Sequence, residues 1–225
     1  MRTAVFVFAL LVSIYSLTYS GAFTTDDEHL FVGGAESLAR LGDYEAKQAY
    51  GNSRTRGNIQ DVEPGQAVVG SFFVRWADAN GLGATQSLFL LNIFVTALTA
   101  CVVFWIVLAL DFQIGTATLT AILFGLGTMA WPYAQTYFRD PLAALMLACA
   151  YLCFELAIAK DKSSNGVFFT AENAENAERA RKVSARSAAK RSLSISRLTA
   201  WALTCACLAA GVFVKSTVAV AIPVL

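Results

Sequence analysis

Three consecutive carboxylates, Asp26, Asp27 and Glu28, stand just before the chain's one histidine, His29, shortly after the first apolar stretch. Crowded carboxylates shift one another's pKa values, and one of them can then act as a general base. Such a cluster can also hold a divalent cation together with phosphate oxygens. The same residues suit the first turn of a helix, where acidic side chains complement the helix dipole, and the two interpretations are compatible.

Three other polar residues could take part in the same chemistry. His29 could be a ligand or a proton shuttle, or simply a solvated surface residue. Arg139 could bind a phosphate in fork geometry, or pair with its neighbour Asp140 in a short polar link. Lys215 lies in or beside an apolar region, where it either extends to the inner surface or marks a functional charge.

The hydropathy pattern indicates that these residues belong to a membrane protein. The chain has 225 residues, of which 56% are hydrophobic, and its mean hydropathy is +0.55. Soluble domains are less apolar. Residues 87–110 and 116–138 contain no charged residue, and a run of about 18 apolar residues is long enough to cross a hydrocarbon core of ~30 Å. We expect an all-α, polytopic membrane helical bundle, with a large first extracytoplasmic loop that contains amphipathic interfacial helices.

The order of apolar and polar segments predicts five regions. Residues 216–225 are too few to cross a bilayer, so we expect the last region to be truncated and the chain to continue past Leu225. The first region is a retained signal-anchor helix or, alternatively, a cleaved signal peptide, since Ser20-Gly21-Ala22 offers small residues for cleavage. The regions are a first transmembrane helix (1–20), an extracytoplasmic loop (21–86), three transmembrane helices (87–159), a basic cytoplasmic insert (160–197) and a further transmembrane region (198–225).

Several boundaries inside these regions follow from residue spacing. The apolar residues of Glu28–Leu41 recur at amphipathic helical spacing, and Gly42 then closes this helix. Ala67–Ala77 is too short to span a membrane and is predicted to lie along the interface. Trp131-Pro132-Tyr133 is predicted to be an interfacial exit, and Pro141 suits the first turn of the next helix.

The charge distribution predicts the orientation of the chain in the membrane. Lysine and arginine gather on the cytoplasmic side, and residues 160–197 form a long basic segment. If this segment is cytoplasmic, then Arg2 and the N-terminus are cytoplasmic as well. Residues 21–86 and the Arg139-Asp140 link are then outside the cell, and the plasma membrane of a prokaryote is the expected location.

The order of these features resembles the GT-C glycosyltransferases. More narrowly, it is similar to the branch that contains the dolichyl-phosphate-mannose protein mannosyltransferases and the aminoarabinose transferases. The resemblance covers most of residues 1–159 together with 198–225. Besides the acid cluster after the first span, it rests on Glu36-Ser37-Leu38, Gly42-Asp43, Pro64-Gly65-Gln66, Leu123–Tyr133 and Phe138–Leu145.

The resemblance implies a reaction and roles for named residues. Such enzymes transfer a sugar from a polyprenyl-phosphate donor on the outer face of the membrane, and an acid in the first outer loop is the general base or helps to bind a metal. Asp27-Glu28 matches the family's Asp-Glu doublet and Asp26-Asp27 matches a variant of it, so Asp26 and Asp27 are the first candidates and Glu28 the next. The family then implies a substrate-binding role for Arg139, at the donor phosphate, and we assign one to His29. A divalent cation is possible.

Other classes of function remain open or are disfavoured. A net charge of +1 argues against a nucleic-acid partner. The five cysteines all lie in apolar stretches, which indicates membrane-helix side chains and not a disulfide framework. A transporter subunit and a non-catalytic membrane scaffold are the alternatives. A transporter more often places polar residues or broken helices at mid-membrane, and the second and third predicted spans have no charge at their centres.

Overall fold

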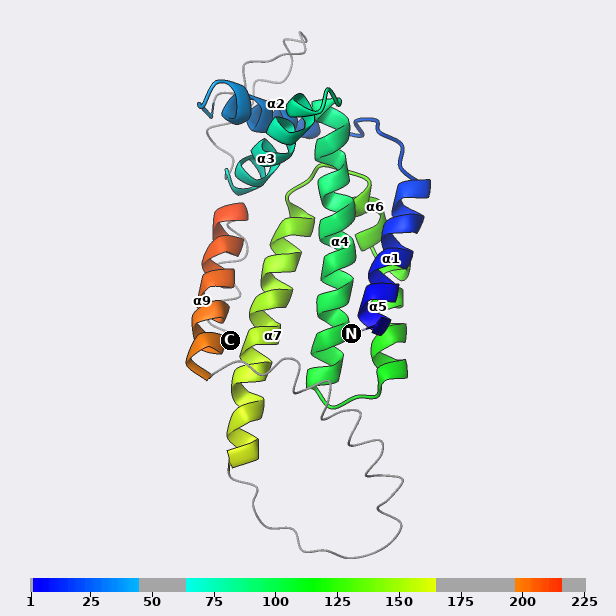
Figure 1. Cartoon of the computed structure of the whole chain (residues 1–225), viewed down its shortest axis with the longest axis vertical. Helices are drawn as coiled ribbons and strands as arrows, with labels where there is room; N and C mark the ends of the chain where they lie inside the picture. The colour runs from blue at the N-terminus through cyan, green and yellow to red at the C-terminus, as the bar shows by residue number, and fades with distance from the viewer. Residues whose placement is uncertain (1, 45–63, 165–196, 216–225) are drawn as a thin grey trace, which may run out of the picture.

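The computed structural model describes residues 2–44, 64–164 and 197–215. These residues form eight α-helices, and no strand occurs among them, which confirms the all-α class. The bounds are α1 Arg2–Leu17, α2 Asp26–Arg40, α3 Gly65–Ala79, α4 Ala84–Ala109, α5 Ile114–Gly127, α6 Ala130–Ala134, α7 Asp140–Ser164 and α9 Arg197–Val214. Helices α1, α4, α5, α7 and α9 run alongside one another, whereas α2 and α3 lie across one end of them (Figure 1).

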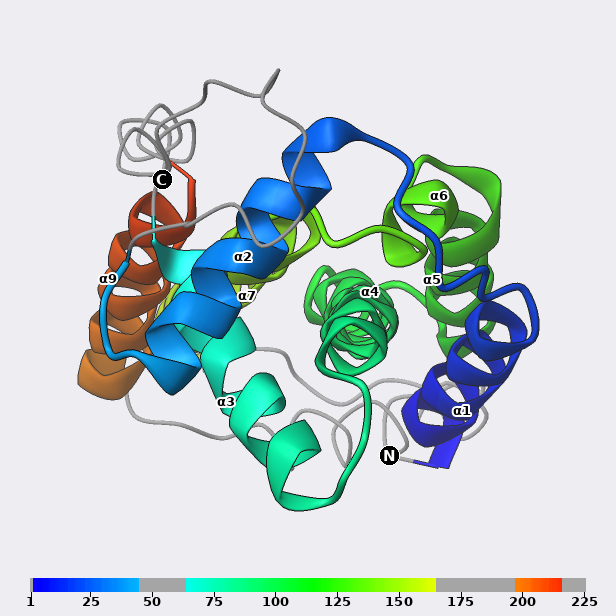
Figure 2. The same ribbon diagram turned by 90° about the horizontal axis from the view of Figure 1, so that it is seen from above.

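Helix α4 is the centre of the fold. It packs against α1, α3, α5, α6 and α7, and the view from above shows it between α7 on one side and α1 and α5 on the other (Figure 2). Large side chains of α4, among them Leu88, Phe89 and Ile93, are fully buried. At about 1.5 Å per residue, its 26 residues extend over roughly 39 Å.

The described helices differ in whether they could cross a membrane. Ala84–Ala109 and Asp140–Ile158 are the two that are long and apolar enough by length and composition. Helices α1 and α5 and the apolar part of α9, Leu198–Val214, are shorter. Of the five spans that the sequence predicted, two therefore have full length within the described ranges.

The third predicted span, about Thr116–Trp131, is interrupted at Thr128. Its backbone is extended, and its hydroxyl donates to the Phe124 carbonyl (2.6 Å) and accepts the Ala130 N–H (3.1 Å). These bonds end α5 and begin the short helix α6. Pro132 fits the first turn of α6, where no backbone N–H is needed. The predicted interfacial exit is thus a helix of its own.

Helix α2 covers the predicted amphipathic segment and has well-defined ends. Thr25 is the N-cap, and the Glu28 carboxylate reaches back to accept the Thr25 N–H (3.2 Å), as in a capping box. At the other end, the N–H groups of Leu41 and Gly42 both bond the Ser37 carbonyl. Gly42 has φ +76°, a left-handed conformation that glycine adopts without strain. The prediction that Gly42 closes this helix is confirmed.

Helices α2 and α3 are joined by charged groups on their facing sides. Arg40 makes a two-pronged pair with Asp78, in which Nε and Nη2 donate over 3.0 and 2.9 Å. Arg75 Nε donates to the Ala39 carbonyl at 3.3 Å. Helix α3, which covers the segment predicted to lie along the interface, also exposes the large side chains of Phe72 and Trp76.

Candidate functional site

The structure places Asp27 and Glu28 in different environments. Asp26 is the first residue of α2. Asp27 is exposed, whereas Glu28 is fully buried. Asp27 can therefore meet a substrate from water, and Glu28 cannot do so in this conformation.

Glu28 is a buried acceptor that joins two distant segments. Its Oε2 accepts from the N–H and hydroxyl of Thr24 and from the Thr25 N–H. Its Oε1 accepts the N–H of Tyr137 at 3.1 Å, from a residue 109 positions away. A buried carboxylate is stable only when hydrogen bonds replace its water shell, and these four donors do so. Glu28 thus fastens the start of α2 to the connection between α6 and α7.

The connection between α6 and α7 is also held from α3 and α4. Asn92 of α4 donates both amide hydrogens, to the carbonyls of Thr136 and Phe138 at 2.7 Å each. Gln66 of α3 donates to the Asn92 side-chain oxygen at 3.3 Å, and the Tyr137 hydroxyl donates to the Gln66 carbonyl at 3.2 Å. Burial raises the pKa of the Tyr137 hydroxyl well above its ordinary value, so it remains a donor.

Sequence reasoning missed Asn92, Gln66 and Tyr137. One signal was available for Asn92, because it is an amide inside an otherwise apolar and uncharged segment. A buried amide must find partners, and the broken backbone between α6 and α7 supplies them. Nothing in the sequence indicated that the partners would be these carbonyls.

Arg139 and His29 both lie against aromatic rings near the acids. The Arg139 guanidinium carbon is 5.7 Å from the ring centre of Phe31 in α2, in a cation–π geometry. Phe31 also makes an edge contact with Phe138 at 6.0 Å. The His29 ring is stacked on Phe23 at 3.8 Å. Of the two predicted substrate-binding residues, His29 is part of α2 and Arg139 contacts α2 through Phe31.

A second charged group lies at the same end of the bundle. Lys215, directly after α9, forms an ion pair with Asp140 at the start of α7, and both side chains are partly exposed. Lys215 is thus at the same end of the bundle as α2 and α3, because α9 ends beside the first turn of α7, where a carboxylate is available. The two predictions that residues 21–86 are outside the cell and that Lys215 extends to the inner surface therefore exclude each other.

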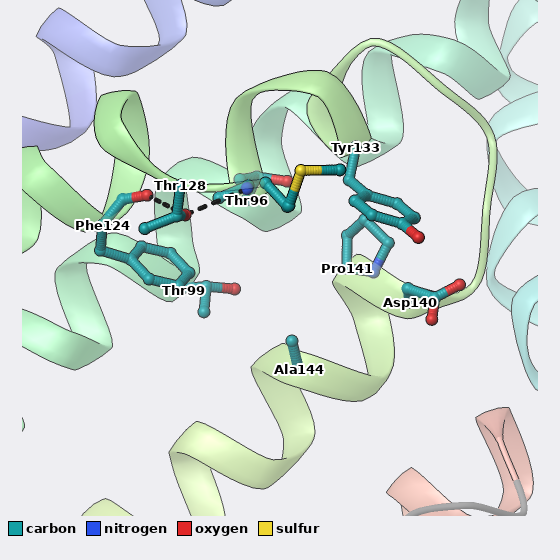
Figure 3. A pocket seen from close by; sticks show the side chains of 10 residues that line it. Thr96, Thr99, Phe124, Thr128, Tyr133, Asp140, Pro141 and Ala144 are labelled. Atoms are coloured by element: carbon teal, nitrogen blue, oxygen red, sulfur yellow. Dashed lines mark hydrogen bonds between the residues drawn. The ribbon is translucent and has the colours of Figure 1, made fainter.

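A mostly apolar pocket of about 350 Å³ lies next to this connection. It is lined by residues of α4, the end of α5, α6 and the start of α7 (Figure 3). In Figure 3, Tyr133 and Pro141 stand on one side of it with Asp140 beyond them, and Phe124 stands on the other side. The lining residues are Thr96, Thr99, Phe124, Thr128, Met129, Ala130, Tyr133, Asp140, Pro141 and Ala144.

The Glu28–Tyr137 and Phe31–Arg139 contacts thus hold the start of α2 against the connection that carries Arg139. No family model, curated protein or solved structure matches this chain. Among the described residues, no group of three or more His, Cys, Asp or Glu side chains is placed to hold a metal ion. The chemical argument therefore rests on Asp27, Arg139 and the groups that position them.

Proposed function

We propose that this protein is an integral membrane glycosyltransferase of the GT-C type. It transfers a sugar from a polyprenyl-phosphate donor to an acceptor at the outer face of the membrane. The observation that carries the proposal is the contact between the acidic start of α2 and the connection between α6 and α7. The Glu28–Tyr137 hydrogen bond and the Phe31–Arg139 contact join these two segments. As a result, the exposed carboxylate of Asp27 and the guanidinium of Arg139 lie at the same end of the apolar helices.

Each group has a role in such a transfer. Asp27, with Asp26 beside it in the sequence, is the general base that takes the proton of the acceptor hydroxyl. In an inverting displacement the base and the leaving group stand on opposite faces of the sugar. Arg139 binds the leaving phosphate, for which a planar guanidinium is well suited. Asp27 is on α2 and Arg139 is on the α6–α7 connection, and the Glu28–Tyr137 bond fastens these two segments together. Holding both groups in this way supplies part of the rate gain through proximity.

The orientation in the membrane is part of the proposal. Helices α2 and α3 lie at one end of the long helices, and the start of α1 and the α4–α5 connection lie at the other (Figure 1). The latter end also holds the last residues of α7 and the first of α9, which flank the basic segment 160–197. The positive-inside rule then assigns α2, α3 and Arg139 to the outer face. This orientation supports the use of a donor presented outside the cell.

The decisive experiment measures sugar transfer from polyprenyl-phosphate donors in membranes that contain the protein. Asp27→Asn should lower the rate by roughly 100-fold or more, because general base catalysis contributes about 10²–10⁴-fold. Its folding should be unchanged, since Asp27 is exposed. Asp111→Asn is the matched control. It makes the same chemical change at the opposite end of α4, where φ is +65°, which asparagine tolerates.

Three results would contradict the proposal. The first is normal transfer by the Asp27→Asn protein, and the second is the absence of transfer by the unmodified protein with every polyprenyl-phosphate sugar tried. Either of these would favour a transporter subunit or a scaffold. The third is an equal loss of transfer in the Asp27 and Asp111 variants, which would show an effect of charge and not of a base.

A further inference from the structure

The pocket beside α6 has the properties of a lipid site. Its volume of about 350 Å³ is at the small end of the range for ligand pockets, roughly 300–1,000 Å³. Half of its lining residues belong to α4 and α7, the two helices long and apolar enough to cross a membrane. Mostly apolar walls suit a hydrocarbon chain, whereas a sugar needs several polar partners.

Thr96 gives the pocket one polar feature. Threonines on helices commonly donate to the carbonyl four residues earlier, as Thr99, Thr118 and Thr120 do here. Thr96 is 3% exposed, yet within the described part of the chain its hydroxyl has no hydrogen-bond partner. A buried hydroxyl without a partner costs free energy. Because threonine has two favourable χ1 rotamers on a helix, the hydroxyl can turn to an acceptor in the pocket.

Positive charge is available at the edge of the pocket. Asp140 lines it, and the Lys215 ammonium group pairs with Asp140. An ammonium group has three hydrogens to donate, so Lys215 can bond an anion while it keeps the carboxylate. Arg139 precedes Asp140 in the chain. An anionic headgroup would therefore find partners where a hydrocarbon chain enters the pocket.

We infer that this pocket binds one acyl chain of an anionic glycerophospholipid. Thr96 donates to the ester carbonyl of that chain, and Lys215 contacts the phosphate. The ester carbonyl distinguishes this ligand from a polyprenyl phosphate, whose chain carries no oxygen to accept from Thr96. The inference requires the membrane location that is part of the proposed function, but it does not require sugar transfer.

The test compares lipids that differ only in the predicted contact. The delipidated protein is titrated with an ester-linked phosphatidylglycerol and with its ether-linked analogue, and bound lipid is measured by native mass spectrometry. Thr96→Val should weaken binding of the ester lipid by roughly three- to tenfold, the size expected for one hydrogen bond, and should leave the ether lipid unchanged. Thr99→Val is the matched control, because Thr99 lines the same pocket but already bonds the Val95 carbonyl.

Further variants test the position and the charge. Ala144→Phe fills the pocket and should abolish the ester preference, and Ala144→Leu is a milder form if the first fails to fold. Lys215→Met should remove the preference for phosphatidylglycerol over phosphatidylcholine.

Equal weakening of ester and ether lipids by Thr96→Val, or equal effects of the two threonine variants, would overturn the inference. Tighter binding of undecaprenyl phosphate that is lost in Ala144→Phe would assign the pocket to the donor chain and overturn it as well. These lipid-binding measurements need no sugar donor. A negative result in them therefore contradicts the lipid site alone, whereas a negative transfer assay contradicts the proposed glycosyltransferase activity.

Discussion

Glu28 directly follows two other carboxylates, Asp26 and Asp27, with nothing in the sequence to mark it as different from them, yet the fold uses it for another purpose. It is fully buried and accepts four hydrogen bonds, one of them from Tyr137. A carboxylate whose lone pairs already accept hydrogen bonds from backbone and hydroxyl groups is poorly placed to take a proton from a substrate hydroxyl. We therefore assign Glu28 a positioning role and leave base chemistry to Asp27 and Asp26.

Glu28→Gln tests this role. The amide nitrogen of glutamine cannot accept a hydrogen bond, so at least one buried N–H loses its partner. The free energy of unfolding should fall by about 1–3 kcal/mol, the cost of a buried unsatisfied group. The fall can be measured by denaturant titration of the purified protein in detergent micelles.

The control for Glu28→Gln is Asp27→Asn, the neighbouring exposed carboxylate. An exposed substitution usually changes stability by less than about 0.5 kcal/mol. The two variants should therefore have different effects. Glu28→Gln should lower the free energy of unfolding, and Asp27→Asn should lower the rate of sugar transfer. An unchanged unfolding curve for Glu28→Gln would show that the Tyr137 contact does not contribute.

The part of this site that the sequence could reveal is the local part. Thr25 and Glu28 have the spacing of a capping box, and Asp26 and Asp27 have the charge pattern of a helix start. The partner Tyr137 could not be found, because no local spacing connects two residues 109 positions apart. Burial decides which acid is accessible, and burial is a property of the packed molecule.

At the scale of elements, α3 and the α6–α7 connection approach each other very closely at Gly70. A Cβ atom on Gly70 would lie 1.9 Å from the Tyr137 hydroxyl oxygen and 2.9 Å from Leu88. The absence of a side chain thus allows Tyr137 to reach the Gln66 carbonyl. The helix tolerates this glycine because the contact compensates for its low helix propensity.

Gly70→Ala should destabilise the protein by about 1–3 kcal/mol, as overpacking of a core does. Tyr137→Phe removes the clashing oxygen, so the double variant Gly70→Ala/Tyr137→Phe should be less destabilised than the sum of the single changes. Melting of helical circular dichroism measures all three. Gly115→Ala is the control, since nothing lies within 4 Å of its added Cβ. Additive effects of the two changes would contradict the contact.

The Arg40–Asp78 pair that joins α2 to α3 predicts a pH effect. Hydrogen bonding to Arg40 lowers the pKa of Asp78 below its ordinary value. A carboxyl whose pKa is lower in the folded than in the unfolded chain stabilises the fold above the unfolded pKa, near ~4. This contribution is lost as the pH falls through the lowered folded pKa. Arg40→Gln should raise the pKa of Asp78, measured by carboxyl NMR titration in micelles.

The control for the pH effect is Arg75→Gln, because Arg75 bonds the Ala39 carbonyl and not Asp78. The pKa of Asp78 should stay low in that variant. If Arg40→Gln leaves the titration of Asp78 where it was, the pair in the structure does not persist in solution.

Element boundaries were predictable where a local signal marks them. Gly42 and Pro141 gave correct helix ends, because left-handed backbone and helix first turns favour these residues. The break at Thr128 was not predicted: Gly127 and Pro132 flank it, but no charged residue in the segment marks the end of a span. Its cause is a side-chain hydroxyl that bonds backbone groups on both sides, a role that threonine has at only some of its positions.

At the scale of the whole molecule, the fold gives its two ends different chemistry. One end has α2, α3, Arg139 and the Lys215–Asp140 pair, and the other has the turn between α4 and α5 (Figure 1). Helix α4 connects the two, and its length of roughly 39 Å exceeds a hydrocarbon core of ~30 Å. The proposed enzyme needs these ends to face opposite compartments, because its donor and its base must both be outside.

Single cysteines at the two ends of α4 test this orientation directly. Asn80 ends α3 just before α4 and is exposed, and Gln113 stands exposed just after α4. In a protein whose five native cysteines are replaced by alanine, a membrane-impermeant maleimide should label Asn80→Cys in intact cells. It should label Gln113→Cys only after the membrane is permeabilised. Labelling of both from outside, or in the reverse order, would place Asp27 and Arg139 away from an external donor, and the proposed transfer could not occur there.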